Sequence, residues 1–225
     1  MTAADAAVRS PHDPHKLGRA RERIDGLPKD AGRGQGGPAP KRIIIAYGFW
    51  IFLLSDIVMF SALFAAYAVL QGATAGGPTG RQLFNLNNVA IETGCLLLSS
   101  FTCGLMMVAA EARSVLWTQL GLLITGLLGL GFVALELHEF ADMIGQGAGP
   151  QRSAFLSAFF ALVGCHGAHV SCGLLWLGTM MAQLLAKGFR PTILHRLMCF
   201  SLFWHALDII WVALFTVVYL LGAIR

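Results

Sequence analysis

Apolar residues follow one another along most of this chain, in runs much longer than the apolar stripe of a soluble helix. Each run has at least the ~20 residues that a helix needs to cross the hydrocarbon layer of a bilayer. Five runs are predicted to be helices: Ile43–Leu70, Asn88–Ala110, Val115–Ile144, Ala154–Ala186 and Ile193–Ala223. The third and fourth exceed a bilayer's thickness, so we expect them to tilt or to project beyond it. The pattern predicts an all-α membrane protein with five transmembrane helices.

The stretch before the first run differs in composition. Residues 1–42 are rich in Gly, Pro, Ala and charge, and we expect a basic tail without a packed core, followed by a transmembrane domain over residues 43–225. Its first basic residues are not followed by an apolar core with a small-residue cleavage site, so it does not read as a signal peptide. Over the whole chain 56% of residues are hydrophobic and 12% charged, which places it in the membrane class.

Lysine and arginine are distributed unevenly between the two sides of the predicted spans. Residues 1–42 hold nine of the sixteen. A nucleic-acid-binding arm is the alternative reading, but the tail lacks aromatic residues and precedes a span. With Arg113, Lys187, Arg190 and Arg196 the tail's side carries thirteen, against three on the other side. The positive-inside rule therefore predicts a cytoplasmic N-terminus and a periplasmic C-terminus, with Gln71–Asn87 outside.

Two histidines lie in the fourth run, within an unusually small-residue stretch. His166 and His169 are spaced i,i+3 and share a helix face, and glycine, alanine, serine and cysteine surround them. Small residues allow close helix packing in a bilayer, and imidazoles at that depth are costly against lipid. We expect this face to point into protein. The five cysteines, with no CxxC pair, are read as apolar packing rather than a disulfide framework, and Cys165 and Cys172 receive no assigned role.

Carboxyl groups and further histidines are predicted at membrane depth in the other runs. Asp56 falls near the middle of the first, where an ionised carboxylate is costly, so we expect a neutral acid hydrogen-bonded to Ser55 or to another span. Glu92 is a second buried carboxyl candidate. Four polar residues gather near the end of the third run, where Glu136 and Glu139 share a face, and His205 and Asp208 are spaced i,i+3 in the fifth. These positions are Asp56, Glu92, Glu136, His138, Glu139, Asp142, His205 and Asp208.

Three interpretations of these polar residues remain open. A structural hydrogen-bonded network, pairing His166 or His169 with a carboxylate and His205 with Asp208, is favoured. A metal site made from the histidines is weaker, because no known ligand spacing such as HExxH is present. A proton- or metal-linked transporter would show broken helices and repeats, which the pattern lacks. We therefore expect no catalytic, cofactor-binding or metal-binding residue in this chain.

Several distinctive motifs occur in order along the chain: GGPTG at 76–80, SAFLSAFF at 153–160, HGAHV at 166–170 and FWHALDIIW at 203–211. In these motifs the chain resembles subunit III of the haem-copper respiratory oxidases, closest to the bo-type ubiquinol oxidase branch. The five-span count and the GGPTG loop favour the quinol branch over subunit III of a cytochrome c oxidase, whose relatives commonly carry two further N-terminal helices. The similarity extends from about Tyr47 to the C-terminus.

The resemblance implies a fold and a role. The fold is a bundle of two helices plus three with a lipid-filled cleft, and the role is that of an accessory, non-redox subunit of a proton-pumping ubiquinol oxidase in the bacterial inner membrane. Haems and copper would lie in the partner subunit I, and this chain would stabilise that subunit, hold phospholipid and support proton uptake. Asp56 matches the family's buried carboxyl that reacts with hydrophobic carbodiimides. No nucleic-acid partner is expected. Separately, Lys187, Arg190 and Arg196 are candidates for binding anionic lipid head groups.

Overall fold

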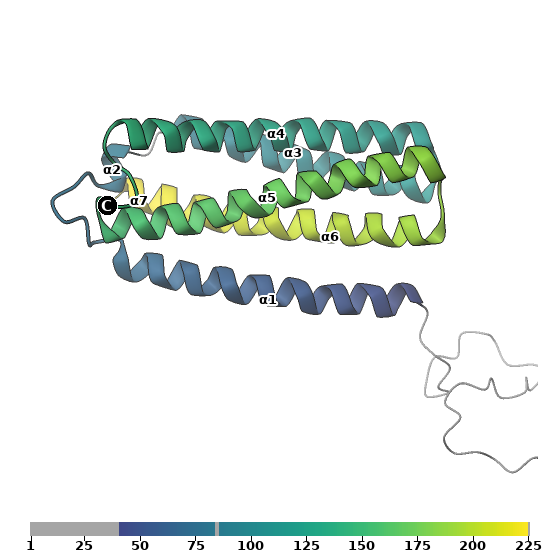
Figure 1. Cartoon of the computed structure of the whole chain (residues 1–225), viewed down its shortest axis with the longest axis horizontal. Helices are drawn as coiled ribbons and strands as arrows, with labels where there is room; N and C mark the ends of the chain where they lie inside the picture. Colours follow the sequence, from purple (N-terminus) through teal and green to yellow (C-terminus); the bar gives the residue numbers. More distant parts are fainter. Residues whose placement is uncertain (1–40, 84–85, 225) are drawn as a thin grey trace, which may run out of the picture. The chain divides into compact units, whose positions relative to one another are not determined.

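The structure, a computed structural model, describes residues 41–83 and 86–224. Every regular element in these ranges is helical (Figure 1). The elements are α1 Lys41–Leu70, α2 Gly80–Leu83, α3 Leu86–Glu111, α4 Val115–Gly145, α5 Ala154–Lys187, α6 Pro191–Leu214, the π-helix η1 Phe215–Leu220 and α7 Leu221–Ile224. The basic tail expected over residues 1–42 lies almost wholly outside the described residues.

Five of these helices are long and apolar enough to cross a membrane, so the predicted all-α protein with five spans is confirmed. Their bounds are Ile43–Leu70, Leu86–Glu111, Val115–Gly145, Ala154–Lys187 and Pro191–Leu220. α4 has 31 residues and α5 has 34. At 1.5 Å per residue they are roughly 46 and 51 Å long, against a hydrocarbon layer of about 30 Å. Both must therefore tilt or extend past the bilayer, as their lengths predicted.

Local chemistry accounts for where α5 and α6 begin and end. The side chain of Ser153 accepts a hydrogen bond from the backbone N–H of Leu156 at 3.2 Å and caps the start of α5. Gly188 follows its last residue with φ +62°, a left-handed conformation that suits glycine. Pro191 then occupies the first turn of α6, where a missing N–H costs nothing. This compact turn brings α5 and α6 side by side.

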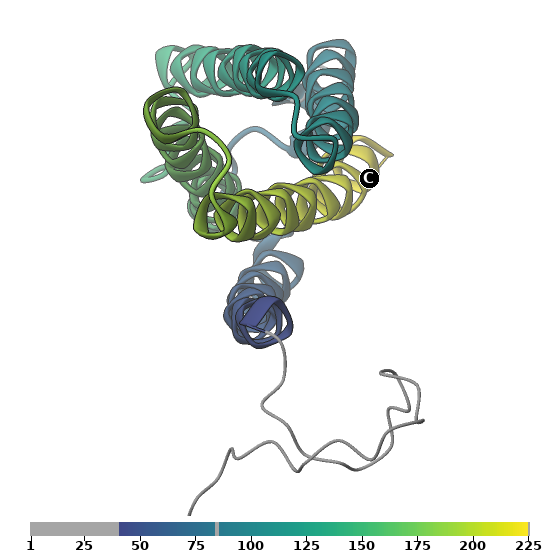
Figure 2. The ribbon, with the colours of Figure 1, turned by 90° about the vertical axis from the view of Figure 1, so that its right-hand side faces the viewer.

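Helices α3, α4, α5 and α6 pack in a ring in which each contacts two neighbours, and α1 lies outside it beside α5 and α6 (Figures 1 and 2). The grouping is thus one helix and four, not the two and three that the resemblance implied. The reason lies in the α3–α4 pair. A Cβ placed on Gly121 would be 2.7 Å from Cβ of Met106, so these backbones approach closely and α3 belongs with α4. This is the small-residue packing expected in a bilayer.

α1 contacts the ring through a narrow stripe of large side chains. Leu53, Phe60 and Tyr67 are buried and spaced by seven residues, while most of the rest of the helix is exposed. That spacing is the heptad seam of two helices packed nearly parallel. The Phe49 ring lies 5.9 Å from that of Trp176 on α5, and the hydroxyl of Tyr67 donates to the carbonyl of Val218 in η1 at 3.5 Å. A few aromatic contacts therefore hold α1 in place.

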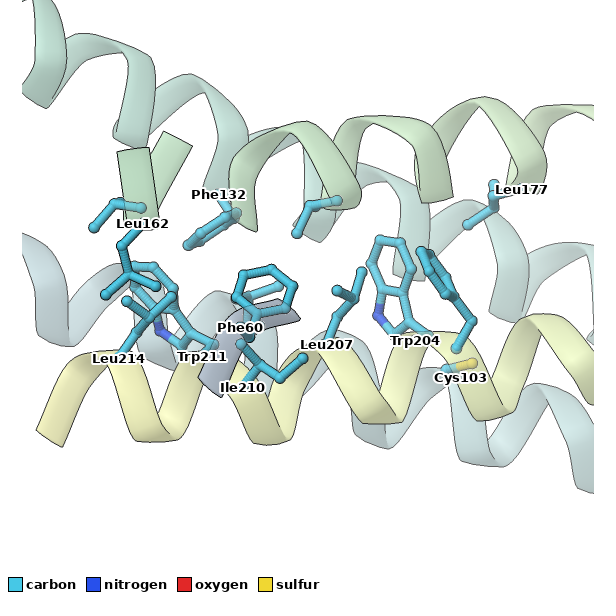
Figure 3. Packing of buried hydrophobic residues seen from close by; sticks show 14 of the residues in the cluster. Phe60, Cys103, Phe132, Leu162, Leu177, Trp204, Leu207, Ile210, Trp211 and Leu214 are labelled. Carbon is cyan, nitrogen blue, oxygen red and sulfur yellow. The ribbon is translucent and has the colours of Figure 1, made fainter. Parts of the chain in front are cut away.

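Two tryptophans of α6 fill the centre of the ring (Figure 3). The Trp204 indole lies against Gly129 of α4 and Gly173 of α5, and its Nε1 donates to the hydroxyl of Ser99 on α3 at 3.0 Å. Trp211 lies two turns further along and packs edge-on against Phe132, with ring centroids 4.6 Å apart. Each indole buries a large apolar surface and its one N–H donor has a partner. The contacts of Trp204 thus connect all four helices of the ring.

Candidate functional site: buried polar groups in the bundle

His166 is completely buried in an aromatic environment rather than paired with a carboxylate. Its ring stacks on Trp211 with centroids 5.2 Å apart and planes at 30°, and it meets Phe132 edge-on at 5.8 Å. Phe60 of α1 approaches from another side at 6.3 Å. Neither ring nitrogen has a hydrogen-bond partner among the residues that the structure describes. The expectation that this face points into protein is met at His166.

His169 and His205 each have a hydrogen-bond partner. Nδ1 of His169 lies 2.7 Å from the carbonyl oxygen of Cys165, one turn earlier on α5. Nδ1 of His205 lies 3.3 Å from the hydroxyl of Ser100 on α3. Asp208 is near enough for its charge to interact with His205, but one of its oxygens, Oδ1, has no hydrogen-bond partner in the described part of the chain. His205 and Asp208 therefore interact through their charges, while the hydrogen bond of His205 Nδ1 is to Ser100.

The polar residues at the end of α4 separate into an inner and an outer pair. His138 and Asp142 face outward, with side chains 71% and 58% exposed and Nε2 to Oδ2 at 3.5 Å. Glu136 is buried at 3% exposure, and Glu139 is half-buried. Helical spacing explains the division, because Glu136 and Glu139 share a face that the intervening His138 does not.

Glu92 of α3 joins this inner pair. It is 1% exposed, and the three carboxyl groups are close enough for their charges to interact. The hydroxyl of Tyr219 donates to Oε2 of Glu139 in a long hydrogen bond of 3.5 Å. Tyr219 was not singled out in the sequence because its position depends on η1, whose wider turn changes which residues of the last span face inward. The one sequence feature that could have indicated Tyr219 is that it lies in the same apolar run as Trp211. The set Glu92, Glu136, Glu139 and Tyr219 is called the carboxyl cluster below.

Asp56 lies on the packed face of α1 and is only half-buried. The hydroxyl of Ser55 donates to the backbone carbonyl of Phe52 at 2.6 Å, and not to Asp56. No hydrogen bond joins Asp56 to another of the residues described. Its surroundings include Cys165 of α5, with which its charge interacts. Asp56 therefore lies at the α1–α5 contact, away from the carboxyl cluster.

The basic residues lie at the opposite end of the bundle from the α1–α3 loop. Arg196 is exposed, and its Nη1 donates to Oε1 of Gln183 at 2.7 Å. It borders a pocket of about 350 Å³ between α1, α5 and α6, lined also by Ile45, Phe49, Trp176, Thr192, His195 and Cys199. Lys187 and Arg190 are exposed in the adjoining α5–α6 turn.

The bundle's polar groups do not gather in a metal-ligand geometry. Among the residues that the structure describes, no group of three or more His, Cys, Asp or Glu side chains is placed to hold an ion. The buried groups are instead distributed over three places, namely the His166 pocket, the carboxyl cluster and the Ser100 contact. These groups can donate and accept hydrogen bonds.

Known proteins resemble this chain over most of its length. The chain matches the family Cytochrome c oxidase subunit III over residues 35–223. It is 51% identical over 181 residues to cytochrome bo(3) ubiquinol oxidase subunit 3 of Pseudomonas putida, covering 79% of this chain and 86% of the relative. The same-named subunit of Pseudomonas aeruginosa is 50% identical over 182 residues, covering 79% and 85%. Quinol oxidase subunit 3 of Bacillus subtilis is 45% identical over 175 residues, covering 78% and 86%. These matches confirm the resemblance seen in the sequence, and the chain belongs to the cytochrome c oxidase subunit III family.

Proposed function

We propose that this chain is the accessory subunit III of a ubiquinol:oxygen oxidoreductase of an aerobic respiratory chain. The observation that carries the proposal is its 51% and 50% identity, over most of both chains, to relatives named ubiquinol oxidase subunit 3. The family is named for cytochrome c oxidases, so the electron donor is taken from these nearer relatives. The enzyme is the complex, and this chain supplies no redox centre to it.

The structural role of such a subunit follows from how this bundle is built. Its centre is filled by Trp204, Trp211 and Phe132, whereas its outward faces carry many large apolar side chains. A rigid bundle with apolar faces supports a second membrane protein by shape and dispersion contacts, since lipid already solvates apolar surface. We assign one such face to the catalytic subunit I, which would hold the haems and copper of the complex.

Bound phospholipid is part of the proposal. The pocket bordered by Arg196 combines the apolar walls of Ile45 and Phe49 with cationic and hydroxyl groups, which suits an anionic head group and the start of an acyl chain. Lys187 and Arg190 add positive charge beside it. Cations near a membrane surface attract anionic lipid by about 1 kcal/mol each. The lipid proposal rests on this combination of charge and apolar wall.

We place the chain in a bacterial inner membrane with its basic end cytoplasmic. Arg113 lies in the α3–α4 turn, at the same end of the ring as the α5–α6 turn that holds Lys187 and Arg190 (Figure 1). These cations, together with the basic residues before α1, support a cytoplasmic N-terminus and a periplasmic C-terminus. Support for proton uptake by the complex is proposed from the family resemblance alone.

Purification of the native complex through a tag on this chain tests the assignment. In mild detergent we expect larger subunits to co-purify and the reduced-minus-oxidised optical spectrum to show haem bands. A colourless bundle without companion subunits, from membranes that contain the assembled oxidase, would overturn the proposal and would favour a free-standing transporter.

A further inference from the structure

The carboxyl cluster contains buried polar atoms that the bundle itself does not satisfy. Both carboxyl oxygens of Glu92, and Oε1 of Glu136 and of Glu139, lack a hydrogen-bond partner among the residues that the structure describes. Buried carboxyl oxygens without partners are rare and costly. These oxygens are therefore open to a hydrogen-bond partner other than the chain's own side chains.

A side chain of a partner subunit does not reach Glu92 or Glu136. Glu92 is 1% exposed and Glu136 is 3% exposed, and the atoms that cover them belong to this chain's own helices. On α5 the cover is the backbone at Gly167, because a Cβ there would lie 2.5 Å from Oε2 of Glu136. On the η1 side it is the fully buried Tyr219. Any hydrogen-bond partner of these two carboxyl groups must therefore be small enough to be enclosed by this chain alone.

Charge repulsion and burial disfavour ionisation of the three acids together. The groups that face the cluster are Glu92 from α3, Glu136 and Glu139 from α4 and the phenol of Tyr219 from η1, none of them cationic. Arg152, in the α4–α5 loop, is exposed. Three carboxylates together in a low-dielectric interior would repel one another and lose their hydration. Metal coordination does not remedy this, since the described groups lack the geometry for an ion.

We propose that Glu92, Glu136 and Glu139 form a closed proton-holding site in which carboxylic acids and enclosed water molecules share hydrogen bonds. Each protonated acid donates one hydrogen bond and accepts others, and a water molecule supplies both donors and acceptors. Buried water of this kind typically makes about three hydrogen bonds to otherwise unsatisfied groups. The phenol of Tyr219 completes one side by donating to Glu139. This inference concerns the chain's own interior and does not depend on which electron donor the complex uses.

Infrared spectroscopy of the assembled complex tests the site, because a protonated carboxylic acid has a C=O stretch that a carboxylate lacks. At neutral pH we expect a protonated-acid band that loses intensity in each of Glu92→Gln, Glu136→Gln and Glu139→Gln. Asp142→Asn is the matched control, since it removes an exposed carboxyl of the same helix and should leave the band unchanged. Tyr219→Phe retains the acids but removes a donor, so it should shift the band instead of reducing it.

If a Gln variant does not assemble, isotope labelling of the wild-type complex still tests the site. Carbon-13 glutamate labelling of the wild-type complex should shift part of the protonated-acid band, and no shift at all would overturn the proposal. An unchanged band in all three assembled Gln variants would also overturn it. So would elemental analysis of the dialysed complex that finds a cation lost in Glu136→Gln, because the acids would then be ionised ligands.

Discussion

The carboxyl group of Glu136 lies directly against the backbone of Gly167. A Cβ built on that glycine would be 2.5 Å from Oε2 and 2.7 Å from Oε1 of the glutamate. The α4–α5 contact thus depends on the absence of a side chain at one position in the small-residue stretch around the two histidines. Close packing there brings a polar group, rather than another apolar side chain, against the helix.

Gly167→Ala is therefore expected to destabilise the bundle. Overpacking a filled interior costs about 1–3 kcal/mol, which outweighs the gain of up to about 1 kcal/mol from replacing a helical glycine. The thermal midpoint of the detergent-solubilised complex should fall. Gly178→Ala on the same helix, where nothing lies within 4 Å of the added Cβ, is the matched control and should not lower it.

The same clash predicts a specific rescue. Glu136→Ala removes the atoms that the new methyl would meet, so adding Gly167→Ala to Glu136→Ala should lower the midpoint much less than Gly167→Ala does in the wild-type background. Equal losses in both backgrounds would mean that the two residues do not touch.

Phe60→Ala is expected to loosen α1. Phe60 is 1% exposed and contacts both His166 and His169, in a helix held by few other large side chains. The loss should be near the lower end of the about 3–5 kcal/mol of buried Phe→Ala changes, since lipid solvates part of the exposed surface. Thermal stability of the complex measures it, with Val58→Ala as control at a position 69% exposed. A drop of similar size in both variants would contradict the α1 packing.

Replacing Lys187, Arg190 and Arg196 together with Gln is expected to reduce co-purified anionic phospholipid. At about 1 kcal/mol per cation, the three contribute about 3 kcal/mol. Quantitative lipid mass spectrometry of the purified complex provides the measurement. Arg152→Gln removes an exposed cation from the other end of the bundle and should change nothing. Wild-type lipid content in the triple variant would refute the head-group assignment.

The length of the apolar runs made the five helices predictable, but it did not predict which helices would be neighbours. Apolar length alone located all five spans to within a few residues. The grouping of one helix and four depends on the contact between Gly121 and Met106. The sequence pattern around either residue does not show that the two are in contact. His166 was correctly expected to face protein, yet its stacking on Trp211 depends on the register of α6 against α5.

The polar residues show the same division. Helical spacing predicted that Glu136 and Glu139 share one face, and the structure turns this face toward the interior of the bundle. Tyr219 could not be assigned to them, because a regular α-helix through residues 215–220 would turn it elsewhere and the π-helical turn has no signature in the apolar run. Asp56 was expected at depth and does lie on the packed side of α1, but whether it is a neutral acid stays a prediction.

Topology has its own test. The thirteen-to-three distribution of Lys and Arg predicts that a reporter enzyme fused after Arg225 is active in the periplasm, and that one inserted before Lys41 is active in the cytoplasm. Both reporters active on the same side would exclude an odd number of spans, and exchanged activities would invert the orientation.

The electron donor of the complex tests the account most directly. Oxygen consumption by the complex, purified through a tag on this chain, is to be measured with ubiquinol and with reduced cytochrome c under the same conditions. We predict rapid oxygen uptake with ubiquinol and none above background with cytochrome c. Uptake with cytochrome c but not with ubiquinol would contradict the assignment to a ubiquinol oxidase.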